Sequence, residues 1–396
     1  MRLPNWSRIA LLEDWQHGGF GLYIHWPFCQ SKCPYCDFNS HVSNTVNQTE
    51  WAAAYCQEIE RIGAKTVSKL LKSVYFGGGT PSLMDPETVD SILTKARETW
   101  AFSNNIEITL EANPTSVEAG RFSGYRQAGV NRVSMGIQAL NDHDLRKLGR
   151  LHSAAEARAA FEIAGNVFDR ISFDLIYARQ DQTLAQWRSE LTEALKMSAD
   201  HLSLYQLTIE KGTAFARRQA AGGLHGLPQE DLSADMYELT QELTNSAGFH
   251  AYEVSNHAKI GAESRHNLIY WQAGDYAGIG PGAHGRLTIG SKRYATEAHS
   301  DPKTWLKAVR ESGNGDLAST VQSADECADE YLMMGLRIRE GIDLNRYEKI
   351  AGKKINTNKI NALEEIGMVK INENHLKTTA EGRPVLNAII RELLTE

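Results

Sequence analysis

The sequence has 396 residues, of which 42% are hydrophobic and 23% charged, a balance typical of a globular protein with one large and one smaller domain. No apolar run approaches the roughly 20 residues of a membrane-spanning helix, and the N-terminus lacks the pattern of a secretory signal. The formal net charge of −7 gives no overall reason to expect nucleic-acid binding. Composition therefore predicts a cytoplasmic protein without a nucleic-acid partner.

Short β-rich segments recur at intervals of roughly 30 to 40 residues and alternate with stretches of helix-like apolar spacing. The six segments are Leu22–Trp26, Ser73–Gly77, Ile106–Ala112, Arg132–Gly136, Ile171–Tyr177 and Leu202–Leu207. This alternation predicts an α/β fold with a parallel sheet, either doubly wound or an incomplete (β/α)6 barrel, over residues 20–248. In both cases ligands bind at the carboxyl ends of the strands.

Polar and glycine-rich motifs fall at those strand ends. Gly77–Thr80 follows the second segment, Glu111 lies near the end of the third, Gln138 follows the fourth and Asp174 lies in the fifth. Alone, a glycine run is typical of a flexible turn, and an aspartate in a strand is typical of a satisfied polar group. Their convergence on one edge predicts a single binding site.

Three cysteines, Cys29, Cys33 and Cys36, stand in the loop after the first segment with the spacing C-x-x-x-C-x-x-C. Thiolates are soft ligands that suit zinc or iron–sulfur clusters. A structural zinc ion needs four ligands, and nearby only His25 or His41 would complete a Cys3His site. A cubane cluster held by three thiolates instead leaves one iron open to an outside molecule. The residues themselves leave both alternatives open.

The chain has only five cysteines, which is too few for a disulfide framework in a protein of this length. Cys56 lies in a helix-like segment and Cys327 lies near the C-terminus. Both are expected to be ordinary buried thiols.

The βα rhythm breaks after residue 248, where closely spaced glycines predict a loop-rich segment, residues 249–320, over or beside the mouth of the barrel. Helical patterns, a hairpin and a last helix from Glu381 predict a small winged-helix-like α+β domain over residues 321–396. Its basic residues are interleaved with acids, which favours a structural or lid role over DNA binding. Residues 1–19 form an N-terminal segment before the barrel.

The cysteine spacing on the first βα loop, followed by the glycine turn after the second strand, resembles the radical S-adenosylmethionine (SAM) superfamily. The resemblance implies that Cys29, Cys33 and Cys36 bind a 4Fe-4S cluster whose open iron chelates SAM. It also implies that reductive cleavage of SAM gives a 5′-deoxyadenosyl radical. In such proteins the cofactor supplies the difficult chemistry and the protein orients it.

Nearly the whole sequence resembles the oxygen-independent coproporphyrinogen III oxidase-like family. Residue by residue, the SAM-site positions of that family are matched here by Tyr23, Gly78, Gly79, Thr80, Glu111, Gln138, Arg150 and Asp174. Tyr35 and Leu207 occupy two further positions that line the site but differ in residue type. The resemblance implies that these ten residues bind SAM and that the C-terminal domain caps the barrel.

Two departures favour the HemW haem-chaperone branch of this family over its dehydrogenases. The dehydrogenases carry a further cysteine two positions beyond the third ligand, where this sequence has Phe38, and they carry a longer N-terminal extension before the first strand. The chaperone branch also shows the motif H-N-x-x-Y-W, which stands here at residues 266–271.

That motif has a chemical interpretation of its own. The imidazole of His266 can coordinate haem iron, and Tyr270 and Trp271 offer flat apolar faces with polar edges to a porphyrin. A histidine beside aromatic residues is more typically a satisfied structural residue, but the resemblance favours haem ligation. His284 and His257 are weaker candidates for the same role.

The resemblance therefore predicts a haem chaperone that binds haem, a 4Fe-4S cluster and SAM, and delivers haem to acceptor haemoproteins such as respiratory enzymes. Some acceptors are expected to be membrane-bound, so contact with the membrane is expected only through a partner; a homodimer is a further expectation. The main alternative is a coproporphyrinogen III dehydrogenase, which converts propionates to vinyl groups. A radical SAM enzyme with an unrelated substrate is the third, since the barrel rim does not identify what fills it.

Overall fold

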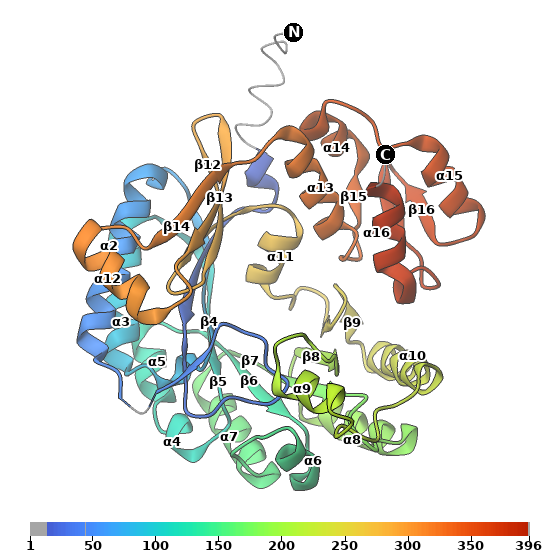
Figure 1. Ribbon diagram of the computed structural model, residues 1–396, viewed down its shortest axis with the longest axis horizontal. Coiled ribbons are helices and arrows are strands. Elements are labelled where there is room, and N and C mark those ends of the chain that lie inside the picture. The colour runs from blue at the N-terminus through green and yellow to red at the C-terminus, as the bar shows by residue number, and fades with distance from the viewer. Residues whose placement is uncertain (1–13, 44, 395–396) are drawn as a thin grey trace.

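Six parallel strands at the centre of one mixed sheet carry the βα units of this computed structural model, which describes residues 14–43 and 45–394 (Figure 1). They are β1 (Phe20–Trp26), β4 (Leu71–Gly78), β5 (Phe102–Ala112), β6 (Arg132–Gln138), β7 (Arg170–Tyr177) and β8 (His201–Gln206). β1 pairs on its outer side with β11 and β8 pairs with β10, so the six strands do not close on each other. The predicted α/β fold with an incomplete (β/α)6 barrel is confirmed.

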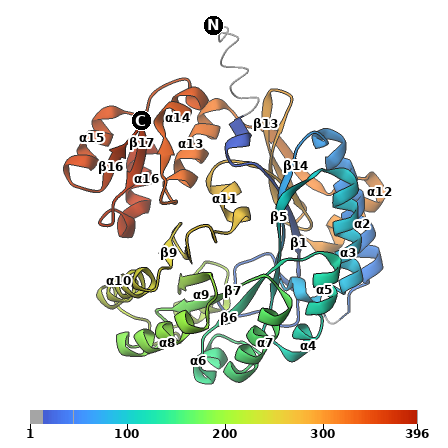
Figure 2. The same cartoon turned by 180° about the vertical axis from the view of Figure 1, so that it is seen from behind.

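Helices cover the outer face of this curved sheet, as the view from behind in Figure 2 shows. Several begin at side-chain caps, such as Ser153 and Thr183, which accept hydrogen bonds from backbone amides of the first turn. The helices of the βα units are α2 (Gln48–Thr66), α3 (Pro86–Thr99), α4 (Ser116–Ala119), α5 (Phe122–Ala128), α6 (Asp142–Lys147), α7 (Ala154–Val167), α8 (Leu184–Met197), α9 (Ala214–Ala220) and α10 (Glu230–Ser246).

Short elements complete the loops around this framework. They are the 3-10 turns η1 (Asp14–His17) and η2 (Pro81–Leu83) and the strands β2 (Phe28–Cys29), β3 (His41–Val42), β9 (His250–Ala251) and β10 (Asn256–Ala258). β2 pairs with β3 in parallel, so the cysteine loop is held at both of its ends.

The prediction of a loop-rich segment over residues 249–320 is wrong for its second half, where four strands extend the same sheet outward from β1. These are β11 (Asp275–Ile279), β12 (His284–Ile289), β13 (Lys292–Ala298) and β14 (Asp316–Val321), with α11 (Arg265–Trp271) before them and α12 (Pro302–Ser312) between the last two. The glycines permit close packing here, since a Cβ on Gly278 would lie 1.9 Å from the carbonyl oxygen of His284. Gly278 and Gly285 thus lie in crowded strands, which the sequence pattern could not distinguish from flexible turns.

The C-terminal domain has its own hydrophobic core and a three-stranded sheet, in agreement with the predicted small α+β domain. In Figure 1 it lies beside the barrel, next to α11. Its elements are α13 (Ala324–Gly335), β15 (Ile342–Asp343), α14 (Leu344–Ala351), α15 (Thr357–Glu365), β16 (Val369–Asn372), β17 (His375–Thr378), η3 (Arg383–Val385) and α16 (Leu386–Leu394). The last helix begins at Leu386 rather than Glu381, because Pro384 lies in the 3-10 turn before it.

Most of the predicted N-terminal segment lies outside the described residues. In the part of the chain that the structure describes, no helix combines the length and apolar character needed to cross a membrane.

Candidate functional site

One cavity opens at the carboxyl ends of the parallel strands, and we call it the cysteine cavity. Of the thirteen residues predicted for the cluster and for SAM, it is lined by all except Tyr23 and Leu207. The predicted residues on its wall are Cys29, Cys33, Tyr35, Cys36, Gly78, Gly79, Thr80, Glu111, Gln138, Arg150 and Asp174. They come from five different βα units, so the fold brings together residues that are spread along the sequence from Cys29 to Asp174.

The three thiols all line this cavity, and each has a polar neighbour. Thr80 Oγ1 lies 3.5 Å from Cys29 Sγ, and a guanidinium N–H of Arg150 donates to Cys33 Sγ across 3.3 Å. Burial raises the pKa of the Cys29 and Cys36 thiols, so the chain alone keeps them protonated, and bound iron would have to displace those protons.

The geometry favours a cluster over a single zinc ion. Among the described residues, no three His, Cys, Asp or Glu side chains are placed to hold one metal ion. His25 cannot complete a Cys3His site as it stands, because its ring nitrogens face the Tyr23 hydroxyl at 3.0 Å and the Asn39 carbonyl oxygen at 2.9 Å. His41 is bound to the side chain of Asn39. A cubane cluster instead ligates each thiolate through a different iron and does not need the sulfurs to converge on one point.

Two carboxyl groups, Glu111 on β5 and Asp174 on β7, also line the cavity. Loss of hydration raises the pKa of Glu111 to about 7 and that of Asp174 to about 6. Tyr75 donates its hydroxyl to Glu111 across 2.7 Å, which opposes that rise. A cationic ligand would stabilise both carboxylates, as the sulfonium and ammonium groups of SAM would.

The backbone of the glycine turn lies tightly against the cysteine loop. Gly78 has a φ of 110°, and a Cβ on Gly79 would lie 2.7 Å from the carbonyl oxygen of Phe28. On the wall of the same cavity, Gln138 Oε1 and Arg150 Nε are buried without a hydrogen-bond partner among the described residues. Unpartnered polar atoms beside a glycine backbone without side chains can bind a ligand that carries several polar groups. SAM is such a ligand, so the residues present fit it.

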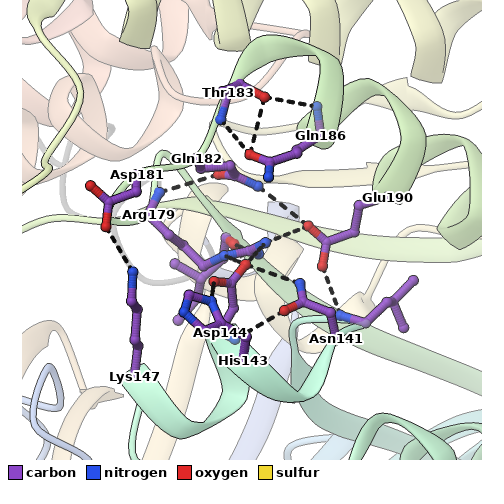
Figure 3. A network of polar contacts seen from close by, with 12 residues as sticks. Asn141, His143, Asp144, Lys147, Arg179, Asp181, Gln182, Thr183, Gln186 and Glu190 are labelled. Carbon is purple, nitrogen blue, oxygen red and sulfur yellow. Dashed lines mark hydrogen bonds and ion pairs between the residues drawn. The ribbon is translucent and has the colours of Figure 1, made fainter.

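Arg150 is held in place by its own contacts and by a polar network behind it. It donates to the Asn113 side chain across 2.5 Å and to the Gly136 carbonyl oxygen across 2.8 Å. Figure 3 shows the network, in which the buried Arg179 joins Asp144 of α6 to Glu190 of α8. Because α6 ends shortly before Arg150, this network fixes the segment that presents the guanidinium to the cavity.

Several wall residues were missed by the sequence analysis, among them Asn113, Ser134 and His152. Asn113 follows β5 directly and precedes a proline, so its place at a strand end was a usable signal, whereas His152 lies in the loop between α6 and α7 and offered no such signal. Tyr23 instead donates to His25 of the same strand, and Leu207 packs against the small hydrophobic cluster that Tyr35 also contacts. Both therefore lie next to the wall rather than on it.

The residues of the H-N-x-x-Y-W motif do not line the cysteine cavity. His266 lies on α11 inside the barrel, where Ser73 Oγ is 2.8 Å from its Nδ1 and the Tyr270 hydroxyl is 2.6 Å from its Nε2. The ring is 1% exposed, and burial lowers its pKa to about 3. Trp271 Nε1 has no hydrogen-bond partner among the described residues. In this conformation the imidazole of His266 is thus neutral and has no free nitrogen for iron.

The two weaker haem-ligand candidates differ from His266 and from each other. His257 is buried on β10, and its Nε2 lies 3.3 Å from the Gln241 amide. His284 is exposed at the start of β12. Neither residue lines the cysteine cavity.

Comparison with known proteins agrees with this architecture. Residues 23–191 match the family model of the radical SAM superfamily, and residues 322–385 match that of the HemN C-terminal domain. The chain superposes on the Escherichia coli coproporphyrinogen III oxidase HemN with a TM-score of 0.81 and 20% identity, covering 99% of this chain and 94% of that one. At that identity the likeness shows the fold alone.

Relatives of higher identity extend over nearly the whole chain. The sequence is 37% identical to a protein of Haemophilus influenzae named heme chaperone HemW, over 95% of this chain and 98% of the relative. It is 33% identical to the Escherichia coli protein of the same name, with 95% and 98% covered. It is also 37% identical to the mitochondrial radical S-adenosyl methionine domain-containing protein 1 of Bos taurus, with 94% and 87% covered. The chain therefore belongs to the radical SAM superfamily and, within it, to the HemW branch of the oxygen-independent coproporphyrinogen III oxidase-like family.

Proposed function

We propose that this protein is a haem chaperone that binds haem, a 4Fe-4S cluster and SAM, and delivers haem to acceptor haemoproteins, respiratory enzymes among them. The relatives named heme chaperone HemW support the proposal along nearly the full length of the chain. The observation that carries its cofactor part is the cysteine cavity, where three thiols, a glycine turn and two buried carboxyl groups face one space.

In the proposed cofactor site each group has a separate task. Cys29, Cys33 and Cys36 hold the cluster, which when bound supplies an open iron for SAM and electrons for its reductive cleavage. Glu111 and Asp174 balance the positive charge of SAM in a site where burial strengthens the attraction.

Two further parts of the wall position these groups. The glycine turn lets the backbone approach the ligand closely. Arg150 donates a hydrogen bond to Cys33 Sγ and so helps to hold this thiol in place.

Haem ligation by His266 is part of the proposal, with Tyr270 and Trp271 as neighbouring surface. Coordination through Nε2 requires the hydrogen bond to Tyr270 to break, because that nitrogen faces the tyrosine hydroxyl in the structure. The side chain would also have to reach a space wide enough for a porphyrin, because it is buried in the structure.

The deciding experiment uses one anaerobic preparation of the full chain with a reconstituted cluster. Haem binding is followed by absorbance titration, and coproporphyrinogen III consumption is followed with SAM and a reductant. We expect stoichiometric haem binding without porphyrinogen turnover. Turnover without haem binding would contradict the proposal and make the protein a coproporphyrinogen III dehydrogenase.

That dehydrogenase is the second candidate function, favoured by the SAM-site residues that line the cysteine cavity. Phe38 weighs against this function. It stands where the dehydrogenases carry a further cysteine, and its side chain is 61% exposed. Phe38 lies on the rim of the cavity, two residues beyond Cys36.

The proposal places the protein in the cytoplasm, with membrane contact only through an acceptor. Flotation with liposomes that contain no protein would contradict this part. Sedimentation of the reconstituted protein tests the expected homodimer.

A further inference from the structure

We propose that His266 is a positioning residue for the SAM site, acting through Tyr75. The inference rests on the proposed binding of SAM in the cysteine cavity, but it does not depend on haem. His266 belongs to the motif that suggested haem ligation, yet in the structure its contacts lead toward Glu111 on the cavity wall.

The first step in the argument is the contact between the His266 ring and Tyr75. The two rings stack with centroids 4.9 Å apart and an interplanar angle of 21°. Ser73, two residues earlier on the same face of β4, lies 2.8 Å from the imidazole Nδ1. Ser73 thus fixes the orientation of the His266 ring, and the face of that ring covers the Tyr75 ring.

The second step is the contact between Tyr75 and the cavity. The Tyr75 hydroxyl donates to Glu111 Oε1 across 2.7 Å, and the backbone amide of Gly78 donates to the same carboxyl group. Glu111 lines the cavity, whereas Tyr75 and His266 lie behind it. The position of the Tyr75 ring therefore sets the direction from which Glu111 is hydrogen-bonded.

The third step is the anchoring of α11, which carries His266. The carboxyl group of Glu107 accepts from the backbone amide of Arg265 at 3.0 Å and is itself paired with Arg170 at 2.8 Å. Glu107 and Glu111 are four residues apart on β5, so they share one face of the strand. A single strand thus holds both the helix that presents His266 and the carboxyl group that Tyr75 contacts.

The consequence is a two-contact link between the motif and the SAM site. Without the imidazole, the Tyr75 ring loses the neighbour on one of its faces and gains freedom to leave Glu111. Loss of that hydrogen bond favours the protonated carboxyl group, which binds the cationic parts of SAM less well. His266 would then influence SAM affinity without touching SAM.

The test is SAM binding by equilibrium dialysis at several pH values, with the full chain carrying its reconstituted cluster. The variants are Tyr75→Phe, which keeps the ring and removes the hydroxyl, and His266→Ala. A hydrogen bond to a charged group corresponds to about a tenfold change, so we expect Kd to rise about tenfold in Tyr75→Phe and by about threefold or more in His266→Ala at neutral pH. In both variants the pH at which affinity rises should move upward, because Glu111 ionises at higher pH. Asp174 and Arg132, which also act on Glu111, are present in the parent and in both variants.

The matched control is His201→Ala. His201 is also a buried histidine, and its Nε2 lies 3.0 Å from the Tyr252 hydroxyl, but it does not contact Tyr75. We expect His201→Ala to lower the melting temperature without moving the pH dependence of SAM binding. The double variant Tyr75→Phe with His266→Ala should be no weaker than Tyr75→Phe alone, since both changes act on one hydrogen bond.

Three results would overturn the inference. The first is a His266→Ala protein that binds SAM with the parent's Kd and pH dependence. The second is a His266→Ala protein whose loss equals that of His201→Ala. In both, SAM binding by the parent would leave the proposed function intact. The third is a reconstituted parent that binds no SAM, which would contradict the SAM part of the proposed function as well.

Discussion

The cysteine cavity and the surroundings of His266, which we call the His266 cluster (Ser73, Tyr75, His266 and Tyr270), use similar residues in opposite ways. The cavity leaves Gln138 Oε1 and Arg150 Nε unpartnered and keeps two carboxyl groups away from direct cationic contact. In the His266 cluster both ring nitrogens face hydroxyl groups within 2.8 Å. Unpartnered buried atoms on a cavity wall can bind a ligand, whereas the paired groups of the His266 cluster stabilise the fold itself.

This contrast separates two kinds of sequence motif. The cysteine spacing predicts residues whose partners come from outside the chain, and their positions at strand ends follow from the fold. The H-N-x-x-Y-W motif predicts a histidine beside aromatic residues, but whether such a histidine is free or satisfied depends on the strands against which it packs.

The largest expected effect concerns the cavity. Replacing Cys33 by serine should abolish most of the bound iron after anaerobic reconstitution, because a hydroxyl is a poor ligand for a cluster iron. Iron analysis and the visible absorbance of the protein measure this loss. Cys56→Ser, in α2, is the control and should keep its iron. Equal iron in the parent and Cys33→Ser would remove the cluster assignment.

The next effect concerns the glycine turn on the same wall. Gly79→Ala places a Cβ 2.7 Å from the Phe28 carbonyl oxygen, so the backbone of the turn must move. If this movement breaks one charge-assisted hydrogen bond to SAM, the affinity for SAM should fall about tenfold or more. Equilibrium dialysis with SAM measures it. The control is Gly165→Ala in α7, where the nearest atom to a Cβ is 3.6 Å away and the helix favours alanine. An equal loss of affinity in both variants would contradict a specific role of the glycine turn in SAM binding.

A smaller effect is expected on stability from the His266 cluster. Ser73→Ala leaves His266 Nδ1 buried without its partner and should lower the free energy of unfolding by about 1–3 kcal/mol, measured by urea denaturation. Ser91→Ala, an exposed position on α3, should change that free energy by less than about 0.5 kcal/mol. An unchanged stability of Ser73→Ala would mean that the cluster is less tightly paired than its geometry indicates.

The smallest effect near neutral pH is a slope in stability with pH. Burial lowers the native pKa of His266 to about 3 from an ordinary 6.5. Below pH 6.5 the imidazole therefore binds a proton in the unfolded chain but not in the native chain. The free energy of unfolding should therefore fall as the pH decreases from 6.5 toward 3. His266→Gln should show a shallower fall than the parent between pH 6.5 and 5, and an identical slope would contradict burial of a neutral imidazole.

Much of the fold was predictable because its signals are local. The alternation of strand and helix patterns predicted six parallel strands, and all six lie within a few residues of their expected positions. The cysteine spacing and Gly77–Thr80 predicted the cavity wall, since residues at the carboxyl ends of parallel strands must meet. Wrong assignments arose where one residue type serves two purposes, as the glycines of β11 and β12 show.

The order of the βα units, the place of the thiols at one edge and membership of the family follow from the sequence, because they depend on periodicity and on residues close together in the chain. The surroundings of His266 follow from the packing of the folded chain, since Ser73 lies 193 positions away along the sequence. The same packing lets Arg179 join Asp144 to Glu190 behind Arg150. Such contacts depend on how distant strands and helices pack, and no local pattern encodes which of many polar side chains will meet.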